Sequence, residues 1–209
     1  MTTHLVSYVI AQALPLPPIQ AAMYEYILAA NGLFIHGQRE GLQAMLPVAA
    51  CTVRGLVEVQ PFVHLEYPRV TREIVECMLD QAREAKDAQD QPVEIVFHLS
   101  WSGANWQLEV PAQEQHTVRV QPLGPAMDSS YARALIEMHS HANYAPEPSR
   151  LDDEDETGFR IFSILGTIFT RPSMRVRVGI YGYRWEIPTT WIFDLPEEIT
   201  DCVGTNALS

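Results

Sequence analysis

Two histidines and one aspartate in a short stretch of the sequence have the residue types and the spacing of a metal site. His139 and His141 flank one serine, and ten residues separate His141 from Asp152. Because residues two apart on a β-strand project to the same side, both imidazoles could reach one point. A catalytic zinc takes three protein ligands from nitrogen and carboxylate donors and keeps a fourth position for water. We therefore predict a Zn²⁺ site formed by His139, His141 and Asp152.

The residues before Asp152 also have a purely structural interpretation. Ser149 and Asp152 have the spacing of a capping box, in which Ser149 is the N-cap of a helix whose dipole favours the carboxylate. The acidic residues 153–156 would then form a solvated first turn of that helix. A lone His-x-His pair is more often structural than metal-binding, but the pair combined with this serine and aspartate favours the metal.

Other metal-binding folds with a His-x-His pair need residues that the sequence lacks. Cupins and amidohydrolase barrels need a further histidine well downstream, whereas none of the seven histidines follows His141. A zinc deaminase needs a Pro-Cys-x-x-Cys run, which is absent. The cysteines form no CxxC pair, so we predict reduced, mostly buried thiols and no disulfide framework. They are Cys51, Cys77 and Cys202.

Hydrophobic periodicity predicts the elements that would position these residues. Residues 71–88 fit an amphipathic helix, and residues 131–141 fit a short helix followed by the strand of the histidines. The helix over 71–88 has an apolar stripe of Ile74, Val75, Met78, Leu79 and Ala82. Further strands are predicted over 62–70, 93–101, 106–113, 161–169 and 174–188. The strand over 161–169 is apolar at nearly every position, as a central strand is.

The chain divides by composition into an extension and one larger domain. Residues 1–60 are rich in aliphatic side chains and contain the proline cluster LPLPP, with turns expected at Asn31-Gly32 and His36-Gly37. We predict an α+β extension over residues 1–60 and a mixed α/β sandwich over residues 61–209. Neither an internal repeat nor a low-complexity segment interrupts this pattern.

Charge and hydropathy narrow the partners and the compartment. The 209 residues carry a formal net charge of −12. This charge disfavours sequence-independent binding to nucleic acid and favours a basic or mixed-charge protein partner. No apolar run reaches membrane-spanning length, and the N-terminus lacks the basic start and the cleavage site of a signal peptide. We therefore expect a cytoplasmic protein that binds neither nucleic acid nor a membrane.

The spacing of the two histidines, Ser149 and Asp152 resembles the JAMM motif of JAB/MPN metallopeptidases, which include deubiquitinating isopeptidases. In this chain the motif runs from His139-x-His141 through seven residues to Ser149 and through two more to Asp152. The order of predicted elements from about Val63 to Pro188 is also similar to that fold. The resemblance implies a cytidine-deaminase-like architecture, a mixed sheet sandwiched by helices, over residues 61–209. It further implies Zn²⁺ as cofactor and the C-terminus of a ubiquitin-like protein as substrate. Other segments resemble a branch of the family encoded on bacterial plasmids and integrated elements.

The family also uses a glutamate on the strand after the first helix, and Glu94 matches that position. A carboxylate beside a metal site can accept a proton from water and pass it to the leaving amine. The resemblance gives Ser149 a second role as a donor to the developing oxyanion. Four other glutamates are less well placed for the role of base: Glu58, Glu66, Glu109 and Glu137. Among these, Glu137 should share the face of the histidines as a neighbour.

Two departures from the family pattern and one alternative function stay open. Val96-Phe97-His98 stand where the family has a glycine-containing strand, which would narrow a substrate groove, and Ala142 replaces a common proline. We expect His98 to be a plain strand histidine rather than a support of the site. The alternative to an enzyme is a JAB/MPN-type scaffold that binds a protein partner, with or without a metal, and performs no catalysis.

Overall fold

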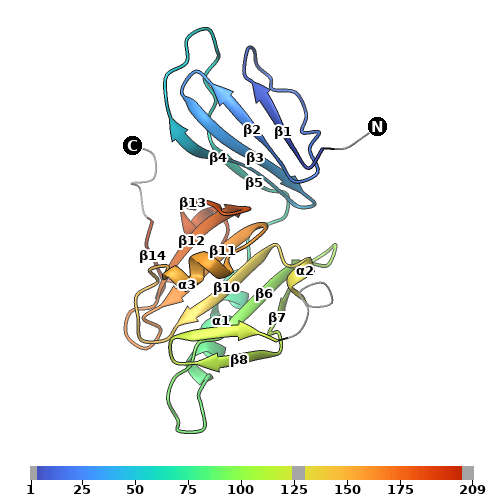
Figure 1. Cartoon of the computed structure of the whole chain (residues 1–209). Coiled ribbons are helices and arrows are strands. Elements are labelled where there is room, and N and C mark those ends of the chain that lie inside the picture. The colour runs from blue at the N-terminus through green and yellow to red at the C-terminus, as the bar shows by residue number, and fades with distance from the viewer. Residues whose placement is uncertain (1–3, 124–129, 204–209) are drawn as a thin grey trace. The chain divides into compact units, whose positions relative to one another are not determined.

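The computed structural model describes residues 4–123 and 130–203, which form two compact units (Figure 1). The first unit comprises residues 1–66 together with 157–159 and 178–185, and the second comprises residues 67–156, 160–177 and 186–209. The fold is mixed α/β with far more residues in strands than in helices. No helix within the described ranges is long and apolar enough to cross a membrane.

The N-terminal residues form a five-stranded sheet. Its strands are β1 (Val6–Ile10), β2 (Tyr24–Ala29), β3 (Gly32–Arg39), β4 (Leu42–Ala50) and β5 (Phe62–Leu65), in that spatial order. β1 and β2 are parallel, and the other pairs are antiparallel. A small core that includes Ile27, Phe34 and Met45 covers one face. Residues 4–60 contain no helix, so the α part of the α+β prediction is wrong.

One turn prediction in this region holds and one fails. The chain reverses between β2 and β3, where Gly32 has a φ of 155°, close to the predicted Asn31-Gly32 turn. His36 and Gly37 instead lie inside β3 and pair with Met45 and Ala44. The glycine misled the prediction because a strand interior seldom contains one unless another group approaches closely.

A second sheet has seven strands, which lie between residues 96 and 201 of the chain. The spatial order is β13-β12-β11-β10-β6-β7, with β14 paired to β12. β10 is parallel to β11 and antiparallel to β6. These strands are β6 (Val96–Trp101), β7 (Trp106–Glu109), β10 (Ile136–His141), β11 (Phe159–Gly166), β12 (Ser173–Ile180), β13 (Tyr183–Ile187) and β14 (Thr200–Asp201). Every residue of β11 is buried, as predicted for a central strand.

The remaining elements are one long helix, three short helices and a β-ribbon. α1 (Arg72–Glu84) buries Val75, Met78, Leu79 and Ala82, four of the five residues of the predicted apolar stripe, and Ile74 is half-buried. The short helices are α2 (Ser130–Arg133), α3 (Arg150–Asp155) and η1 (Thr189–Trp191). β8 (Gln113–His116) and β9 (Arg119–Pro122) form the ribbon.

Two further predictions need correction. Residues 174–188 form a hairpin of two strands, β12 and β13, because Tyr181 and Gly182 both adopt positive φ values and reverse the chain. The cysteines are exposed rather than buried. In α1, for example, Cys77 lies between the buried Val75 and Met78 in sequence, so the helical rotation turns it away from the apolar stripe.

Candidate metal centre

The sheet holds the two histidines on a central strand. β10 pairs with β6 on one side and with β11 on the other. Ile136, Met138 and Ser140 are fully buried on one face of β10, and the histidines therefore project from the opposite face. The Nε2 atoms of His139 and His141 lie 3.1 Å apart. The predicted convergence of the two imidazoles is confirmed.

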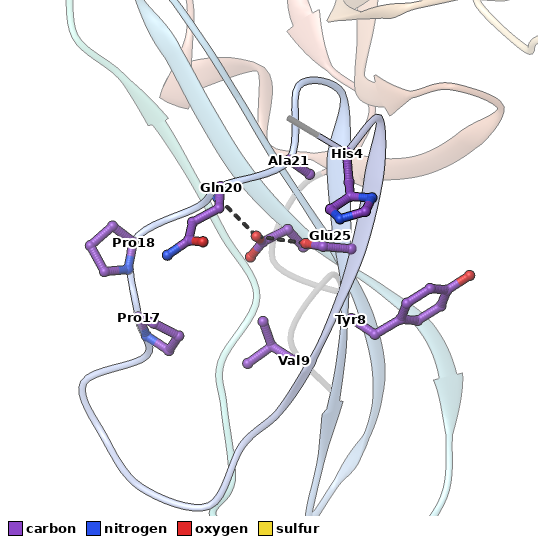
Figure 2. Close-up of a pocket in the computed structure, with 9 residues that line it drawn as sticks. His4, Tyr8, Val9, Pro17, Pro18, Gln20, Ala21 and Glu25 are labelled. Carbon is purple, nitrogen blue, oxygen red and sulfur yellow. Dashed lines mark hydrogen bonds between the residues drawn. The ribbon is translucent and has the colours of Figure 1, made fainter. Parts of the chain in front are cut away.

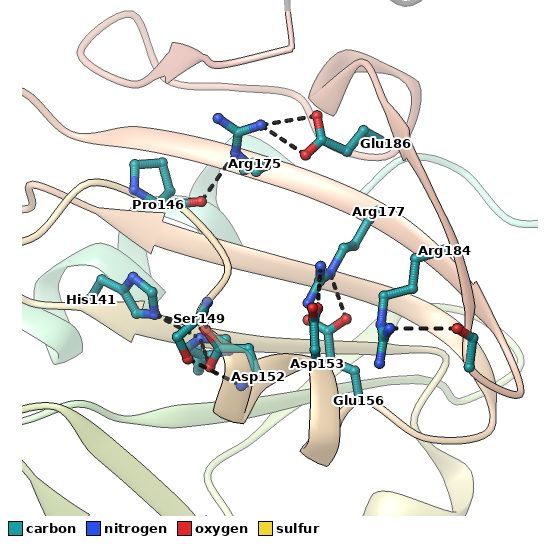
Figure 3. A network of polar contacts seen from close by, with 12 residues as sticks. His141, Pro146, Ser149, Asp152, Asp153, Glu156, Arg175, Arg177, Arg184 and Glu186 are labelled. Carbon is teal, nitrogen blue, oxygen red and sulfur yellow. Dashed lines mark hydrogen bonds and ion pairs between the residues drawn. The ribbon is translucent and has the colours of Figure 1, made fainter.

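Helix α3 brings Asp152 to the histidines. Its Oδ1 atom lies 3.1 Å from His139 Nε2, and its Oδ2 atom lies 3.5 Å from His141 Nε2. The capping box is also present, since the Ser149 backbone N–H donates to Asp152 Oδ2 and the Asp152 N–H donates to Ser149 Oγ. Figure 3 shows Ser149 and Asp152 beside His141. The capping-box interpretation of this stretch is therefore correct, and the same helix start places the Asp152 carboxylate where it could share a metal ion with the histidines.

The geometry and chemistry of the three side chains fit a metal ion. Each residue offers one ligand atom, and these atoms lie within 4.8 Å of one another. Tetrahedral zinc with ligands at about 2.0–2.1 Å separates its ligand atoms by roughly 3.3 Å. The His141 Nδ1 atom is 3.0 Å from the Ala145 carbonyl oxygen, to which it can donate. That tautomer leaves the Nε2 lone pair of His141 facing the cluster, as metal-binding histidines require.

The pKa values of Asp152 and His141 show that the carboxylate interacts strongly with the histidines. Burial alone would raise the pKa of Asp152, but hydrogen bonds from His139, His141 and the Ser149 N–H hold it well below its ordinary range. Burial would lower the pKa of His141, yet the hydrogen bond with Asp152 and the Ala145 carbonyl raise it. The carboxylate is therefore ionised and the site attracts positive charge.

The loop between β10 and α3 packs tightly over β11. The Thr167 N–H donates to the Tyr144 carbonyl at 2.7 Å, and the Ile168 N–H donates to the Ala142 carbonyl at 3.1 Å. A Cβ atom on Gly166 would lie only 2.5 Å from the Pro146 nitrogen and 2.7 Å from the Tyr144 oxygen. Glycine at position 166 therefore permits the close approach of the loop that orients His141 and leads to Asp152.

Two arginines of β12 hold this loop and α3 in place (Figure 3). Arg175 donates from Nε to the Pro146 carbonyl at 3.1 Å and forms a two-armed ion pair with Glu186. Arg177 is buried and pairs with Asp153 at 2.8 Å and with Glu156 at 2.5 Å. Both arginines contact the backbone and the acids around Ser149 and Asp152, so they help to fix the position of Asp152.

Glu94 lies beside the histidines, two residues before β6 begins. The Ile95 N–H donates to Ser140 Oγ at 3.1 Å, and the Ser140 N–H donates to the Ile95 carbonyl at 3.0 Å. The antiparallel register that pairs His139 with Val96 therefore continues to this point and sets Glu94 opposite His141, on the same face. The ribbon fixes the backbone of Glu94, whose N–H donates to the His116 carbonyl at 2.9 Å.

The carboxyl group of Glu94 is buried and electrostatically coupled to the cluster. Burial raises its pKa, the positive charges of His141 and His139 oppose that rise, and Asp152 adds to it. A carboxylate with a raised pKa is a stronger base than that of an ordinary glutamate and accepts a proton more readily near neutral pH. This is the electrostatic setting that a general base needs.

The other glutamates differ from Glu94 in their surroundings. Glu58 and Glu66 are exposed residues of the first unit, and Glu109 pairs with Arg133 at 3.3 Å. Glu137 shares the face of the histidines, as expected.

Sequence reasoning missed a buried polar cluster beside Glu137. Its carboxylate lies 3.5 Å from His98 Nε2 and 3.8 Å from an Arg160 nitrogen. His98 Nδ1 bonds to Ser130 Oγ at 2.6 Å, and the Arg160 guanidinium lies 3.5 Å from the Tyr131 ring centre. The register of β6 against β10 pairs His98 with Glu137, and Arg160 lies two residues before Phe162, which pairs with Glu137 from β11; the sequence shows neither register.

Comparisons of the chain with protein-family models and with curated protein sequences found no match. The site geometry and the motif resemblance therefore carry the functional argument.

Proposed function

We propose that this chain is a zinc-dependent metallopeptidase or isopeptidase of the JAB/MPN type. One observation carries the proposal: the ligand atoms of His139, His141 and Asp152 converge, and the buried Glu94 faces His141 across the strand pair. A site kept only for helix capping would need Ser149 and Asp152 but neither the histidine pair nor a carboxyl group with a raised pKa beside it. The helix-sandwiched JAB/MPN fold of residues 61–209 is part of the same proposal.

Each residue of the site has a role that its geometry supports. Zinc held by the three ligands would polarise a scissile carbonyl and supply a water nucleophile near neutral pH. Glu94 would serve as the base that takes up a proton and passes it to the leaving amine. The Ser149 oxygen accepts the Asp152 N–H, so its own hydroxyl proton is left to donate to the oxyanion.

The substrate class follows from the motif resemblance. We propose a bond at the C-terminus of a ubiquitin-like protein, in a cytoplasmic protein encoded on a bacterial plasmid or mobile element. The segments 94–101, 106–113, 152–162 and 175–188 are similar to the PRTRC system protein A group. A net charge of −12 suits a basic or mixed-charge protein partner and supports no nucleic-acid role.

Metal binding is tested by replacing, one at a time, two aspartates of helix α3. Purified protein, reconstituted with zinc and dialysed, should contain about one zinc per chain. Asp152→Asn keeps an oxygen that can accept the Ser149 N–H, so the cap survives while the charged ligand is lost. Asp155→Asn, on the exposed end of the same helix, is the matched control and should bind zinc like the wild type. A wild type that holds no zinc, or an Asp152→Asn that holds a full equivalent, contradicts the proposed site.

Catalysis is tested with two glutamates. Glu94→Gln should retain zinc but cleave a ubiquitin-like fusion roughly a hundred- to ten-thousand-fold more slowly, the usual contribution of a general base. Glu109→Gln changes an exposed glutamate and should cleave normally. If the wild type binds zinc but cleaves no ubiquitin-like fusion or peptide, the non-catalytic scaffold is the correct function instead.

A further inference from the structure

The first unit contains a large cavity over one face of its sheet. It has a volume of about 800 Å³, within the range of roughly 300–1,000 Å³ that small-molecule sites occupy. The register pairs Gln38 with Gln43, His36 with Met45, and Met45 with Phe62, so side chains from three strands lie on this face. The sheet therefore supplies a floor that combines apolar surface with amide and imidazole groups.

The proline-rich segment of residues 14–19 forms the wall of this cavity. A buried carboxylate anchors the far end of the segment, since Glu25 accepts hydrogen bonds from the Gln20 N–H at 2.9 Å and the Ser7 hydroxyl at 2.8 Å. Figure 2 shows Pro17, Pro18 and Gln20 on this segment, with Gln20 bonded to Glu25. Pro17 and Pro18 also line a smaller cavity of about 280 Å³. A wall with fixed proline φ angles and an anchored end is preorganised.

His36 is the feature of the cavity that points to a ligand. The residue is only 6% exposed, and its Nε2 atom lies 2.8 Å from Gln43 Nε2. An amide nitrogen can only donate, so His36 Nε2 accepts and the imidazole proton is on Nδ1. Nδ1 is buried and has no hydrogen-bond partner within residues 4–123 and 130–203. A buried donor without an acceptor is unfavourable, and an acceptor on a ligand would remove that penalty.

The charges around the cavity select against ions. Burial lowers the pKa of His36, opposed by Glu25, so the imidazole is neutral at physiological pH. Glu58 lines the cavity and the chain as a whole is acidic, which disfavours an anionic ligand. The unpaired Nδ1–H of His36 is a hydrogen-bond donor, and a cation cannot accept a hydrogen bond. The remaining class is an uncharged molecule with an apolar body and a hydrogen-bond acceptor.

We propose that this cavity binds an uncharged, mainly apolar molecule that carries a carbonyl group. The apolar body packs between the proline-rich wall and the side chains of Met45 and Phe62. In the complex the His36 Nδ1–H donates to the carbonyl oxygen while Nε2 keeps its contact with Gln43, and the amide of Gln38 binds further polar atoms of the ligand. This site is separate from the proposed metal centre in its residues and in its chemistry.

The test uses the full chain and the neutral fluorophore Prodan, a naphthalene with a single carbonyl. Titration should give saturable binding with a blue-shifted emission. His36→Phe keeps an aromatic ring but removes the donor, and should weaken binding about three- to tenfold, the worth of one neutral hydrogen bond. Gln60→Trp fills the cavity from an exposed position and should weaken binding further. His4→Phe, beside the smaller cavity, is the matched control and should change nothing.

A second measurement does not depend on the folding of any variant. Long-range ¹H–¹⁵N spectra of the wild type should show a neutral His36 with the proton on Nδ1, and that nitrogen should shift when Prodan is added. The absence of saturable binding, an unmoved His36 resonance, or a His4→Phe effect larger than those of His36→Phe and Gln60→Trp would each overturn the proposal.

Discussion

Replacing Gly166 by alanine should weaken metal binding while the sheet stays folded. The new Cβ would lie 2.5 Å from the Pro146 nitrogen and 2.7 Å from the Tyr144 oxygen, and both are backbone atoms that cannot rotate away. An ordinary contact begins near 3.4 Å, so the loop must move by about 0.9 Å. The loop carries the Ala145 carbonyl that orients His141, and it leads to Asp152.

The size of the effect follows from these contacts. Inserting a methyl group into a tightly packed contact costs about 1–3 kcal/mol of stability. Loss of the group that orients a metal-binding histidine weakens metal affinity about 10- to 100-fold. A displacement of this size in a catalytic site costs on the order of a hundredfold in rate. We therefore expect zinc affinity and hydrolysis to fall together, by more than the loss of stability explains.

Competition with a chromophoric chelator gives the zinc affinity, and thermal unfolding of the zinc-free protein gives the stability. The control is Gly158→Ala, where φ is +82° and no atom lies within 4 Å of the new Cβ. That variant should lose about 1 kcal/mol through backbone strain but keep its zinc affinity. Wild-type zinc affinity in Gly166→Ala, or an equal loss in Gly158→Ala, would refute the role given to this contact.

Three further predictions address the cap, the arginine support and the thiols. Ser149→Ala should cost about 1 kcal/mol of stability through the lost cap. It should slow hydrolysis about a hundred- to a thousand-fold while zinc stays bound, and unchanged hydrolysis would contradict a role of Ser149 in stabilising the oxyanion. Arg177→Met removes a buried cation from Glu156 and Asp153 and should lower the free energy of unfolding in urea by about 3–5 kcal/mol. A loss below about 1 kcal/mol would show that Arg177 does not support α3. The three exposed cysteines should all react with a thiol reagent in the folded protein, and replacing them by serine should leave hydrolysis within a few-fold. Inactivation by the reagent without unfolding would instead indicate a cysteine mechanism.

The parts of the site that are local in sequence were predictable. A period of two places His139 and His141 on one face, and a spacing of three places Asp152 against the cap of its own helix. The same local reasoning found the buried stripe of α1. Glu94 needed more than periodicity: the family resemblance selected it, and the register beside Ser140 then places it opposite His141.

The parts that depend on contacts between distant segments were not predictable. Gly166 is needed only because the loop at Pro146 crosses it, and a sequence does not show which backbone will approach a given glycine. Arg177 supports α3 from a strand more than twenty residues away, and its burial depends on the acids it meets. In the first sixty residues the composition led to the prediction of an α+β extension, but residues 4–60 form strands and no helix, because pairing within the sheet decides their structure.

The ligands of the proposed centre come from regions that should open at very different rates. β10 lies in the sheet between two neighbours, whereas α3 has six residues and none of them is buried. A helix so short is not stable alone, so Asp152 can leave by a local opening of α3 that does not disturb the histidines. Zinc would join the two regions, and its binding energy would appear as protection of residues 150–155 from hydrogen exchange. Metal exchange would then proceed through the fraying of one helical turn, at a rate set by α3 rather than by the sheet.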